Sequence, residues 1–320
     1  MKLGVFTVLL SDRPLEEALD HIVELGLDAV EIGTGAYPGN AHCDPIALLG
    51  SATRLRAFRR AIESRGLVIS GLSCHGNPLH PRRPIARAHH ESFERTLKLA
   101  RRLDVETVIT FSGCPGAEPR ATVPSWIVSP WPPEFLEQLE WQWSERVVPY
   151  WKDAAKLARK QGIRVAIEMH PNFVAYNPES MLRLREVAPD TIGCNFDPSH
   201  MWWQGIDPSA AIRELGDCIR HVHAKDTRID ARNTAVNGVL DAKRYTRELE
   251  RSWIFRTVGY GHDAIAWKDI VSNLRLTGYD HVLSIEHEDS VLSPSEGLGR
   301  AVAFLQDVLI RQAPGEAYWA

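Results

Sequence analysis

Short apolar runs alternate with longer amphipathic stretches along the chain, and their order predicts a repeating strand–helix unit. Between the apolar runs, positions at helical spacing predict helices, for example over residues 14–25, 45–64 and 86–103. Eight parallel strands with helical crossovers close a barrel, so we expect an α/β fold of the (β/α)8 TIM-barrel type. The eight predicted strands are residues 3–10, 29–33, 67–73, 106–111, 163–170, 192–196, 219–224 and 281–285.

The alternation suggests one domain covering residues 1–320, because barrels of this kind often exceed 250 residues and no linker is evident. A doubly wound open sheet is the alternative, but no GxGxxG turn follows the first strand. Two long loops interrupt the pattern, residues 112–133 after the fourth strand and 227–263 after the seventh. Both follow strand C-termini, where barrel active sites lie, which favours binding loops over surface insertions or a subunit contact.

Composition and charge are those of an ordinary globular protein. Apolar residues make up 44% and charged residues 24% of the chain, and the net charge is −4 without a long run of either sign. This balance argues against nucleic acid or a membrane surface as a partner. The N-terminal apolar run is too short for a signal peptide, and no stretch reaches the ~18 apolar residues of a membrane span. Five cysteines without CxxC spacing indicate a reducing compartment, so we expect a cytoplasmic protein.

Acidic and histidine side chains end the last four predicted strands. Glu168 lies at the end of the fifth strand, Asp197 follows the sixth, His223 ends the seventh and Glu286 follows the eighth. The C-terminal ends of barrel strands meet at one face, so these side chains should converge there. Three carboxylates and one imidazole suit one divalent ion, with Mn²⁺ favoured and Mg²⁺, Co²⁺ and Zn²⁺ as alternatives. Each residue also has a structural alternative, such as a helix cap for Asp197 or a core position for His223.

These strand ends carry a resemblance to a known family. The chain resembles the sugar isomerase/epimerase superfamily with a xylose-isomerase-like barrel, typified by ketose 3-epimerases. In that family a glutamate, an aspartate, a histidine and a second glutamate end the fifth to eighth strands and bind one Mn²⁺-type ion. The matching positions here are Glu168, Asp197 in Asp-Pro-Ser-His, His223 in His-Val-His-Ala-Lys-Asp, and Glu286 in Ser-Ile-Glu-His-Glu-Asp.

Other stretches are similar to a branch of this superfamily that includes the catalytic subunits of C-glycoside deglycosidases. These stretches are residues 74–80, 112–116, 130–137 and 255–262. In addition, simple epimerases lack the two long loops over residues 112–133 and 227–263. The superfamily implies isomerisation or epimerisation of a sugar by enolisation next to a metal-bound carbonyl. The branch implies lyase-type β-elimination from a 3-oxo-glycoside.

Partners follow from the same resemblance. We expect a small sugar or glycoside substrate and a homo-oligomer, or a hetero-oligomer with a small second subunit if the chain is a deglycosidase. A non-catalytic sugar-binding protein is a less favoured alternative, because binding alone does not need four metal ligands. A metal-dependent nuclease on the same barrel would need more histidine ligands and a basic groove.

Catalytic and substrate-binding candidates lie near the predicted metal ligands. We expect Glu168, Glu286 and His170 to be catalytic, since a histidine suits a base near neutral pH, although His170 could instead orient Glu168. The resemblance implies that His200, three residues after the aspartate, contacts substrate. The remaining candidates for substrate binding are His75, Lys225 and Arg256, the last two of which could instead form structural salt bridges.

Overall fold

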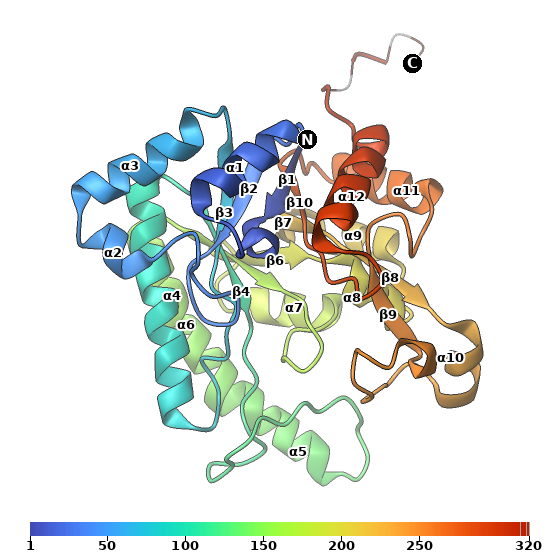
Figure 1. Ribbon diagram of the computed structural model, residues 1–320. Helices are drawn as coiled ribbons and strands as arrows, with labels where there is room; N and C mark the ends of the chain where they lie inside the picture. Colours follow the sequence, from blue (N-terminus) through green and yellow to red (C-terminus); the bar gives the residue numbers. More distant parts are fainter. Residues whose placement is uncertain (314, 318, 320) are drawn as a thin grey trace.

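Eight parallel strands form a closed barrel at the centre of the molecule (Figure 1), which confirms the predicted TIM-barrel fold. The computed structural model describes residues 1–313, 315–317 and 319, so residues 314, 318 and 320 of the predicted domain lie outside the described residues. Neighbouring strands follow the order β1-β10-β7-β6-β5-β4-β3-β2 around the barrel. These strands are β1 (Lys2–Phe6), β2 (Ala29–Gly33), β3 (Val68–Ser73), β4 (Thr107–Phe111), β5 (Arg164–Glu168), β6 (Ile192–Phe196), β7 (Ile219–Ala224) and β10 (Val282–Ile285).

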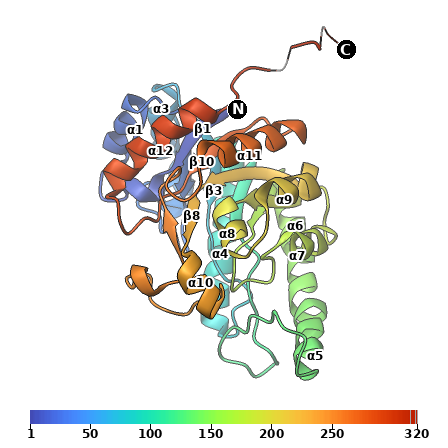
Figure 2. The ribbon, with the colours of Figure 1, turned by 90° about the vertical axis from the view of Figure 1, so that its right-hand side faces the viewer.

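Helices surround the barrel and cover the outward faces of its strands (Figures 1 and 2). Strands such as β2 and β6 are buried along their whole length, because one face points into the barrel and the other packs against helices. The helices are α1 (Leu15–Glu24), α2 (Pro45–Leu49), α3 (Ala52–Glu63), α4 (Arg83–Leu103), α5 (Glu134–Trp141), α6 (Val148–Gln161), α7 (Pro178–Arg185), α8 (Pro198–Trp203), α9 (Pro208–Leu215), α10 (Ala231–Asn237), α11 (Ala264–Leu276) and α12 (Pro294–Val308).

The structure corrects three details of the sequence prediction. The first strand ends at Phe6, and Thr7–Leu10 forms a 3₁₀ turn instead of continuing it. The helix predicted over residues 45–64 is two helices, because the chain turns at Gly50 and the Ser51 side chain accepts a hydrogen bond from the Arg54 amide as the N-cap of α3. The third correction concerns the loop over residues 227–263, which contains regular structure.

Two antiparallel strands, β8 (Asp226–Ile229) and β9 (Trp253–Arg256), frame this second insertion, and α10 lies between them. The first insertion, residues 112–133, leads from β4 into α5 and then through a π-helical segment, Gln142–Val147, into α6. In Figures 1 and 2 both insertions lie at the end of the molecule opposite the N-terminus. They therefore extend from the C-terminal face of the barrel.

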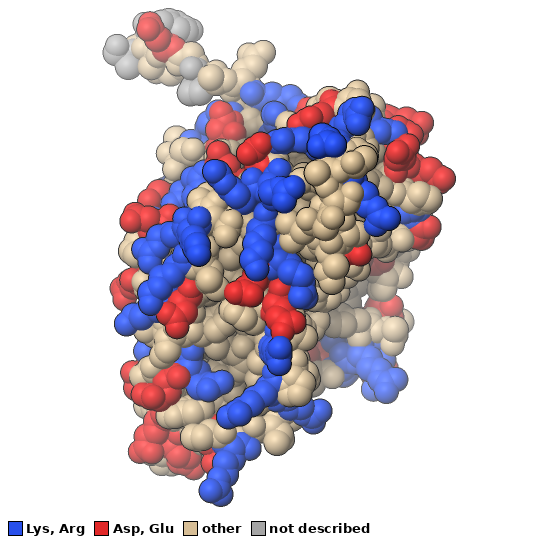
Figure 3. Space-filling model, turned by 90° about the vertical axis from the view of Figure 1, so that its left-hand side faces the viewer, with Lys and Arg blue, Asp and Glu red and all other residues tan. Residues whose placement is uncertain are grey.

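Basic and acidic side chains are interspersed over the outer helices. Figure 3 shows Lys and Arg side chains in a band on one side of the molecule, with Asp and Glu side chains among them. Elsewhere in the structure, ion pairs join Arg59 to Glu63 and Asp104, and Arg65 to Asp20. Among the described residues, no helix has both the length and the apolar composition that crossing a membrane requires.

Candidate metal centre and active site

The four predicted metal ligands come together at the C-terminal face of the barrel. Glu168 is the last residue of β5, Asp197 directly follows β6, His223 is the penultimate residue of β7, and Glu286 directly follows β10. One ligand atom from each lies within 4.8 Å of all the others. The side chains of Glu168, Asp197 and His223 are almost fully buried, and that of Glu286 is 15% exposed. This spacing suits a single ion, and binding of that ion stays a prediction.

Unpartnered polar atoms support the fit of this site to a cation. Asp197 Oδ2, His223 Nδ1 and Glu286 Oε2 are buried and make no hydrogen bond. His223 Nδ1 nevertheless lies only 2.9 Å from Glu286 Oε2 and 3.3 Å from Glu168 Oε2. Buried polar atoms that converge without making hydrogen bonds are costly unless a further group satisfies them. A divalent ion bound by three carboxylates and one imidazole would satisfy all of them.

The orientation of His223 is set by Glu31, a buried residue of β2. His223 Nε2 lies 3.1 and 3.0 Å from the two carboxylate oxygens of Glu31, which can only accept, so Nε2 donates. This bond turns Nδ1 toward the other ligands, in the carboxylate–histidine–metal arrangement found at many metal sites. The Ser73 hydroxyl also donates to Glu31, at 2.5 Å. Glu31 was not among the residues predicted from the sequence, although a carboxylate inside the buried run Ala-Val-Glu-Ile-Gly was a usable signal.

Replacing Glu31 by glutamine should weaken metal binding by about 10- to 100-fold, the usual effect of losing such an outer partner. The amide keeps the shape of the side chain but removes the charge that orients and polarises His223. Titration of the metal-free variant with Mn²⁺ measures the effect, and circular dichroism checks that the barrel is intact. Unchanged Mn²⁺ affinity in a folded Glu31→Gln variant would show that this contact supports only the fold.

Electrostatic shifts show how strongly these groups interact. Burial alone would raise the pKa of Glu286, but Lys225 and His223 outweigh it and lower that pKa to about 2. Burial likewise opposes ionisation of Glu168, yet His223 leads the neighbours that hold the pKa of Glu168 well below its usual range. Burial would lower the pKa of His223, but Glu31, Glu286 and Glu168 raise it well above its usual value. Both carboxyl groups are thus charged around a ring that they bias toward the cationic form.

Asp197 caps a helix and also lies among the predicted metal ligands, two roles that were alternatives at the level of the sequence. Its Oδ1 accepts a hydrogen bond from the Ser199 amide at 2.8 Å and caps helix α8, while Oδ2 faces the other ligands. Burial, with repulsion from Glu168 and Glu286, raises the pKa of this carboxyl. The cap fixes the aspartate in place, and the repulsion marks a site where positive charge is favoured.

Three histidines predicted from the sequence surround Glu168. His75 Nε2 lies 2.8 Å from Glu168 Oε2, and His200 Nε2 lies 3.6 Å from Glu168 Oε1. The rings of His170 and His200 contact each other, with centroids 4.2 Å apart. His170 Nδ1 lies 2.6 Å from the Pro171 carbonyl oxygen and donates to it, so Nε2 carries the lone pair in the neutral ring. Burial and His200 lower the pKa of His170 to about 3, so its ring is neutral at pH 7.

The two basic candidates occupy different surroundings. The Lys225 ammonium is buried, 2.7 Å from Glu288 Oε2 and 3.4 Å from Glu286 Oε2, and it lies 4.3 Å from the centroid of the Phe255 ring. It therefore lies next to the predicted metal ligands. Arg256, in contrast, bonds through Nε to both carboxylate oxygens of Asp289, the structural salt bridge considered as its alternative. Substrate binding by either residue stays a prediction.

A polar network behind the ligands was also missed by sequence analysis. Asn195 in β6 donates to Glu168 Oε2 at 3.2 Å, and its amide oxygen lies 2.9 Å from His221 Nδ1. His221 in turn lies 3.2 Å from the Ser70 hydroxyl through Nε2. These contacts link β6, β7 and β3 inside the barrel and fix the carboxylate of Glu168.

A cavity of about 350 Å³ opens beside His170 and His200, and both insertions contribute to its walls. We call it the aromatic cavity. The cavity is lined by Trp126, Val128, His170, Pro171, Asn172, His200, Trp203, Leu240, Asp241, Ala242, Tyr245, Trp253 and Phe255.

Comparison with curated proteins finds relatives along most of the chain. The uncharacterized protein YfiH of Bacillus subtilis is 38% identical over 312 residues, which are 97% of this chain and 99% of that protein. The rhizopine catabolism protein MocC of Rhizobium meliloti is 27% identical over 277 residues, which are 87% of this chain and 75% of that protein. An inosose dehydratase of Geobacillus thermodenitrificans is 25% identical over about half of each chain, 47% and 50% respectively.

Solved structures with the same fold include sugar enzymes and a zinc-binding protein. A D-psicose 3-epimerase matches with a TM-score of 0.61 and 17% identity, covering 97% of this chain and 99% of that chain. The IOLI protein with a bound zinc atom matches with a TM-score of 0.66 and 17% identity, covering 97% and 98%. The probable 3-DHS dehydratase AsbF of Bacillus anthracis matches with a TM-score of 0.66 and 17% identity, covering 96% and 99%. At these identities the likeness shows the fold alone.

The family model described as "Xylose isomerase-like TIM barrel" matches residues 19–308. This range includes every barrel strand except β1. The match contains the four predicted ligands and both insertions. The resemblance expected from the strand ends is therefore confirmed at the level of the family. This chain belongs to the xylose isomerase-like TIM barrel family.

Proposed function

We propose that this protein is a divalent-metal-dependent enzyme that removes a proton next to the carbonyl group of a sugar or related polyhydroxy ketone, in the manner of a sugar isomerase or epimerase. The observation that carries the proposal is the set of three unpartnered ligand atoms, on Asp197, His223 and Glu286, facing one another at the open end of the barrel. Family membership and epimerases among the structures with the same fold support the same chemistry.

Glu168, Asp197, His223 and Glu286 would hold the ion, with Mn²⁺ proposed and Zn²⁺ as the alternative that IOLI suggests. When bound, a divalent ion polarises a carbonyl and stabilises the negative charge that develops beside it. The protein itself must then position the substrate and move the proton.

His170 is the proposed base. Because Nδ1 donates to the Pro171 carbonyl, Nε2 carries the lone pair and is the proposed acceptor of the proton from the carbon next to the substrate carbonyl. His75 and His200, which lie against Glu168, would bind substrate hydroxyls beside the ion. In an epimerase the two glutamates, Glu168 and Glu286, could instead exchange the proton on opposite faces.

A second candidate is β-elimination from a 3-oxo-glycoside. The base takes the proton from C2, the C–H electrons form a C1–C2 double bond, and the C1 substituent leaves with its bonding electrons and is then protonated. The aromatic cavity beside His170 and His200 favours this candidate, because a leaving group needs space that a free ketose does not. Relatives named inosose dehydratase also support this candidate, because a dehydratase eliminates a group as well.

Product analysis in D₂O distinguishes the candidates. Mn²⁺-loaded protein is incubated separately with fructose-like ketoses and with a 3-oxo-glucoside that bears a chromogenic aglycone, and NMR follows the proton next to the carbonyl. We expect Mn²⁺-dependent exchange of this proton for deuterium. An epimer without aglycone release identifies an isomerase, whereas aglycone release identifies a lyase. Absence of exchange with every substrate, at full metal loading, would contradict the proposed function.

A further inference from the structure

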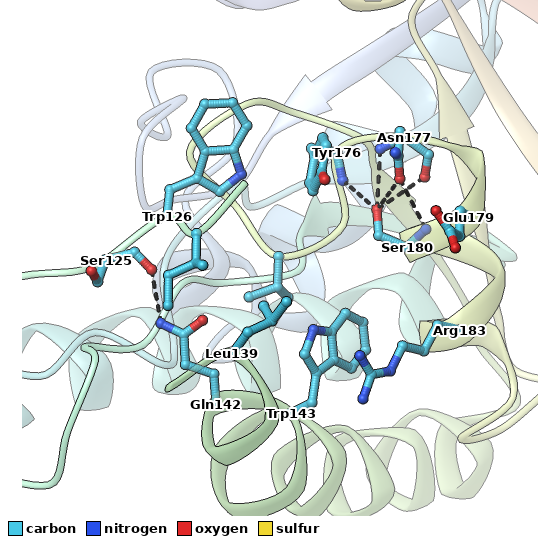
Figure 4. A pocket seen from close by; sticks show the side chains of 12 residues that line it. Ser125, Trp126, Leu139, Gln142, Trp143, Tyr176, Asn177, Glu179, Ser180 and Arg183 are labelled. Atoms are coloured by element: carbon cyan, nitrogen blue, oxygen red, sulfur yellow. Dashed lines mark hydrogen bonds between the residues drawn. The ribbon is translucent and has the colours of Figure 1, made fainter. Parts of the chain in front are cut away.

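A hollow of about 180 Å³ lies between the first insertion and α7, away from the predicted metal ligands (Figure 4). The Gln142 side-chain amide donates to the Ser125 carbonyl oxygen at 2.8 Å beside it. The Arg183 guanidinium lies 4.2 Å from the centroid of the Trp143 ring and pairs with Glu140 at 3.1 Å. The positive charge at this hollow is therefore already used by the protein itself.

A larger cavity, of about 370 Å³, lies at the N-terminal end of the barrel, and we call it the mouth cavity. Its lining includes the first residues of six barrel strands, namely Lys2 of β1, Val68 of β3, Thr107 of β4, Arg164 of β5, Ile219 of β7 and Val282 of β10. The four predicted metal ligands lie at the opposite, C-terminal ends of their strands. The mouth cavity is therefore separate from the candidate active site.

Two β-bulges place side chains at the mouth cavity. Ser70 of β3 has no pairing partner on β2, and Arg220 of β7 has none on β6, because each is the extra residue where the register shifts. Both residues line the cavity. Bulges are rare between parallel strands, and a bulge changes the direction in which a side chain points. The barrel thus departs from regular pairing at two positions that border this cavity.

A glycine on the neighbouring strand makes room for Arg220. A Cβ atom on Gly193 of β6 would lie 2.5 Å from Arg220 Cγ and 2.5 Å from the Cys218 carbonyl oxygen. Both distances are far shorter than atoms tolerate in a packed structure. Any larger residue at position 193 would displace either the arginine or the backbone beside it.

Arg220 lies among other cations. Its Nε is buried and makes no hydrogen bond. Burial, Arg164 and Arg185 lower the pKa of Arg220, although Asp217 opposes them. Because burial and like charges both disfavour the charged form, an anion that supplies acceptor oxygens would stabilise this guanidinium.

The acidic groups of the mouth cavity are already paired. Each has a cationic partner other than Arg220: Asp104 pairs with Arg59, Asp280 with the Met1 ammonium and Glu106 with Arg164. Among the described residues, neither Lys2 nor Arg220 takes part in an ion pair. Two positive charges at the rim of this cavity are therefore left for a ligand.

We infer that the mouth cavity binds a small oxyanion of the phosphate type, held chiefly by the Arg220 guanidinium. The planar fork of a guanidinium matches the oxygens of phosphate, and Lys2 and Arg164 at the same rim favour a doubly charged ion. A cavity of about 370 Å³ has room for free phosphate or for the phosphate group of a small metabolite. The inference does not rest on the proposed function, because the site lies at the other end of the barrel.

Binding of phosphate compounds tests the inference. Calorimetry on Mn²⁺-loaded protein uses inorganic phosphate, sn-glycerol 3-phosphate and, as the neutral control, glycerol. We expect both phosphates to bind at one site per chain and glycerol not to bind. Tighter binding of inorganic phosphate identifies the free ion as the ligand, whereas tighter binding of the ester identifies a phosphorylated metabolite.

Replacing Arg220 by glutamine should weaken phosphate binding by about tenfold or more, because the charge-assisted hydrogen bonds are lost. Arg54→Gln is the matched control, since this exposed arginine on α3 does not line the cavity and the change in net charge is the same. Phosphate should also raise the melting temperature of the parent but not that of Arg220→Gln, whose melting in phosphate-free buffer shows that it is folded.

Phosphate can also bind to a metal ion, so the titration is repeated on Glu286→Gln, in which the mouth cavity is unchanged. We expect this variant to bind phosphate as the parent does. The inference is wrong if the parent binds no phosphate, if Arg220→Gln binds it as tightly as the parent, or if Arg54→Gln loses as much affinity. Binding that is lost in Glu286→Gln but kept in Arg220→Gln would place the anion at the metal centre and overturn the inference as well.

Discussion

Replacing Glu286 by glutamine is expected to slow Mn²⁺-dependent proton exchange by ~10³-fold or more. Glu286 Oε2 is buried, makes no hydrogen bond and lies 2.9 Å from His223 Nδ1, so the substitution removes one charged ligand without emptying the space. The electrostatic contribution of a bound metal is several kcal/mol, and each 1.36 kcal/mol of barrier corresponds to a factor of ten in rate. Proton exchange in D₂O, followed by NMR, measures the loss.

Glu288 supplies a matched control two residues away. Its carboxylate lies 2.7 Å from Lys225 Nζ, but the side chain is 52% exposed and does not belong to the four-ligand cluster. Glu288→Gln should therefore retain metal binding and most of the activity. If Glu286→Gln and Glu288→Gln lose activity equally while both retain the metal, the carboxylates act through Lys225, and Glu286 is not a ligand.

Replacing His170 by alanine should lower activity by ~10²-fold or more while the metal stays bound, because general-base catalysis contributes a factor of this size. The prediction depends on geometry: His170 lies beside His200, and Nε2 is its free nitrogen. The measurement combines exchange rates with metal content for each variant. His80→Ala is a suitable control, since this histidine accepts a hydrogen bond from the Arg82 amide in a loop.

The metal content decides how the His170→Ala result is interpreted. Loss of activity with full metal occupancy supports His170 as the base. If metal affinity and activity fall together, His170 positions Glu168, and the proton is transferred by the glutamates. Full activity in the variant would remove His170 from the mechanism altogether.

The barrel could be predicted because each of its strands is recognisable from a short stretch of consecutive residues. Each strand is a short apolar run buried on both faces, and each of the last four strands is followed or ended by a polar residue that a buried run does not otherwise tolerate. Since parallel strands in a barrel all end at one face, the positions of Glu168, Asp197, His223 and Glu286 in the sequence were enough to predict that they converge.

The second insertion could not be predicted in the same way. Strands β8 and β9 pair across a long intervening segment, and each has only four residues, too few for a periodic pattern to be distinguished from a loop. The apolar side chains of β9 pack into a small local cluster with Trp203 instead of the barrel core. Their environment depends on tertiary contacts that the sequence does not display.

Glu31 shows a different limit. Its strand was predicted correctly, but the reason for a buried carboxylate there is His223, which lies 192 positions later in the chain. The unusual residue was visible in the sequence, whereas its partner was not. The same holds for the contact between Asn195 and Glu168, whose strands pair so that the two residues are adjacent.

Titration of the metal-free protein with Mn²⁺ tests the central claim most directly. The protein is stripped with a chelator, and calorimetry is performed on the parent and on the Glu168→Gln and Glu286→Gln variants, with elemental analysis of the untreated protein. The account predicts one divalent ion per chain in the parent, a single Mn²⁺ site after stripping and severe loss of affinity in both variants. A parent without a metal site, or variants that bind Mn²⁺ as the parent does, would contradict it.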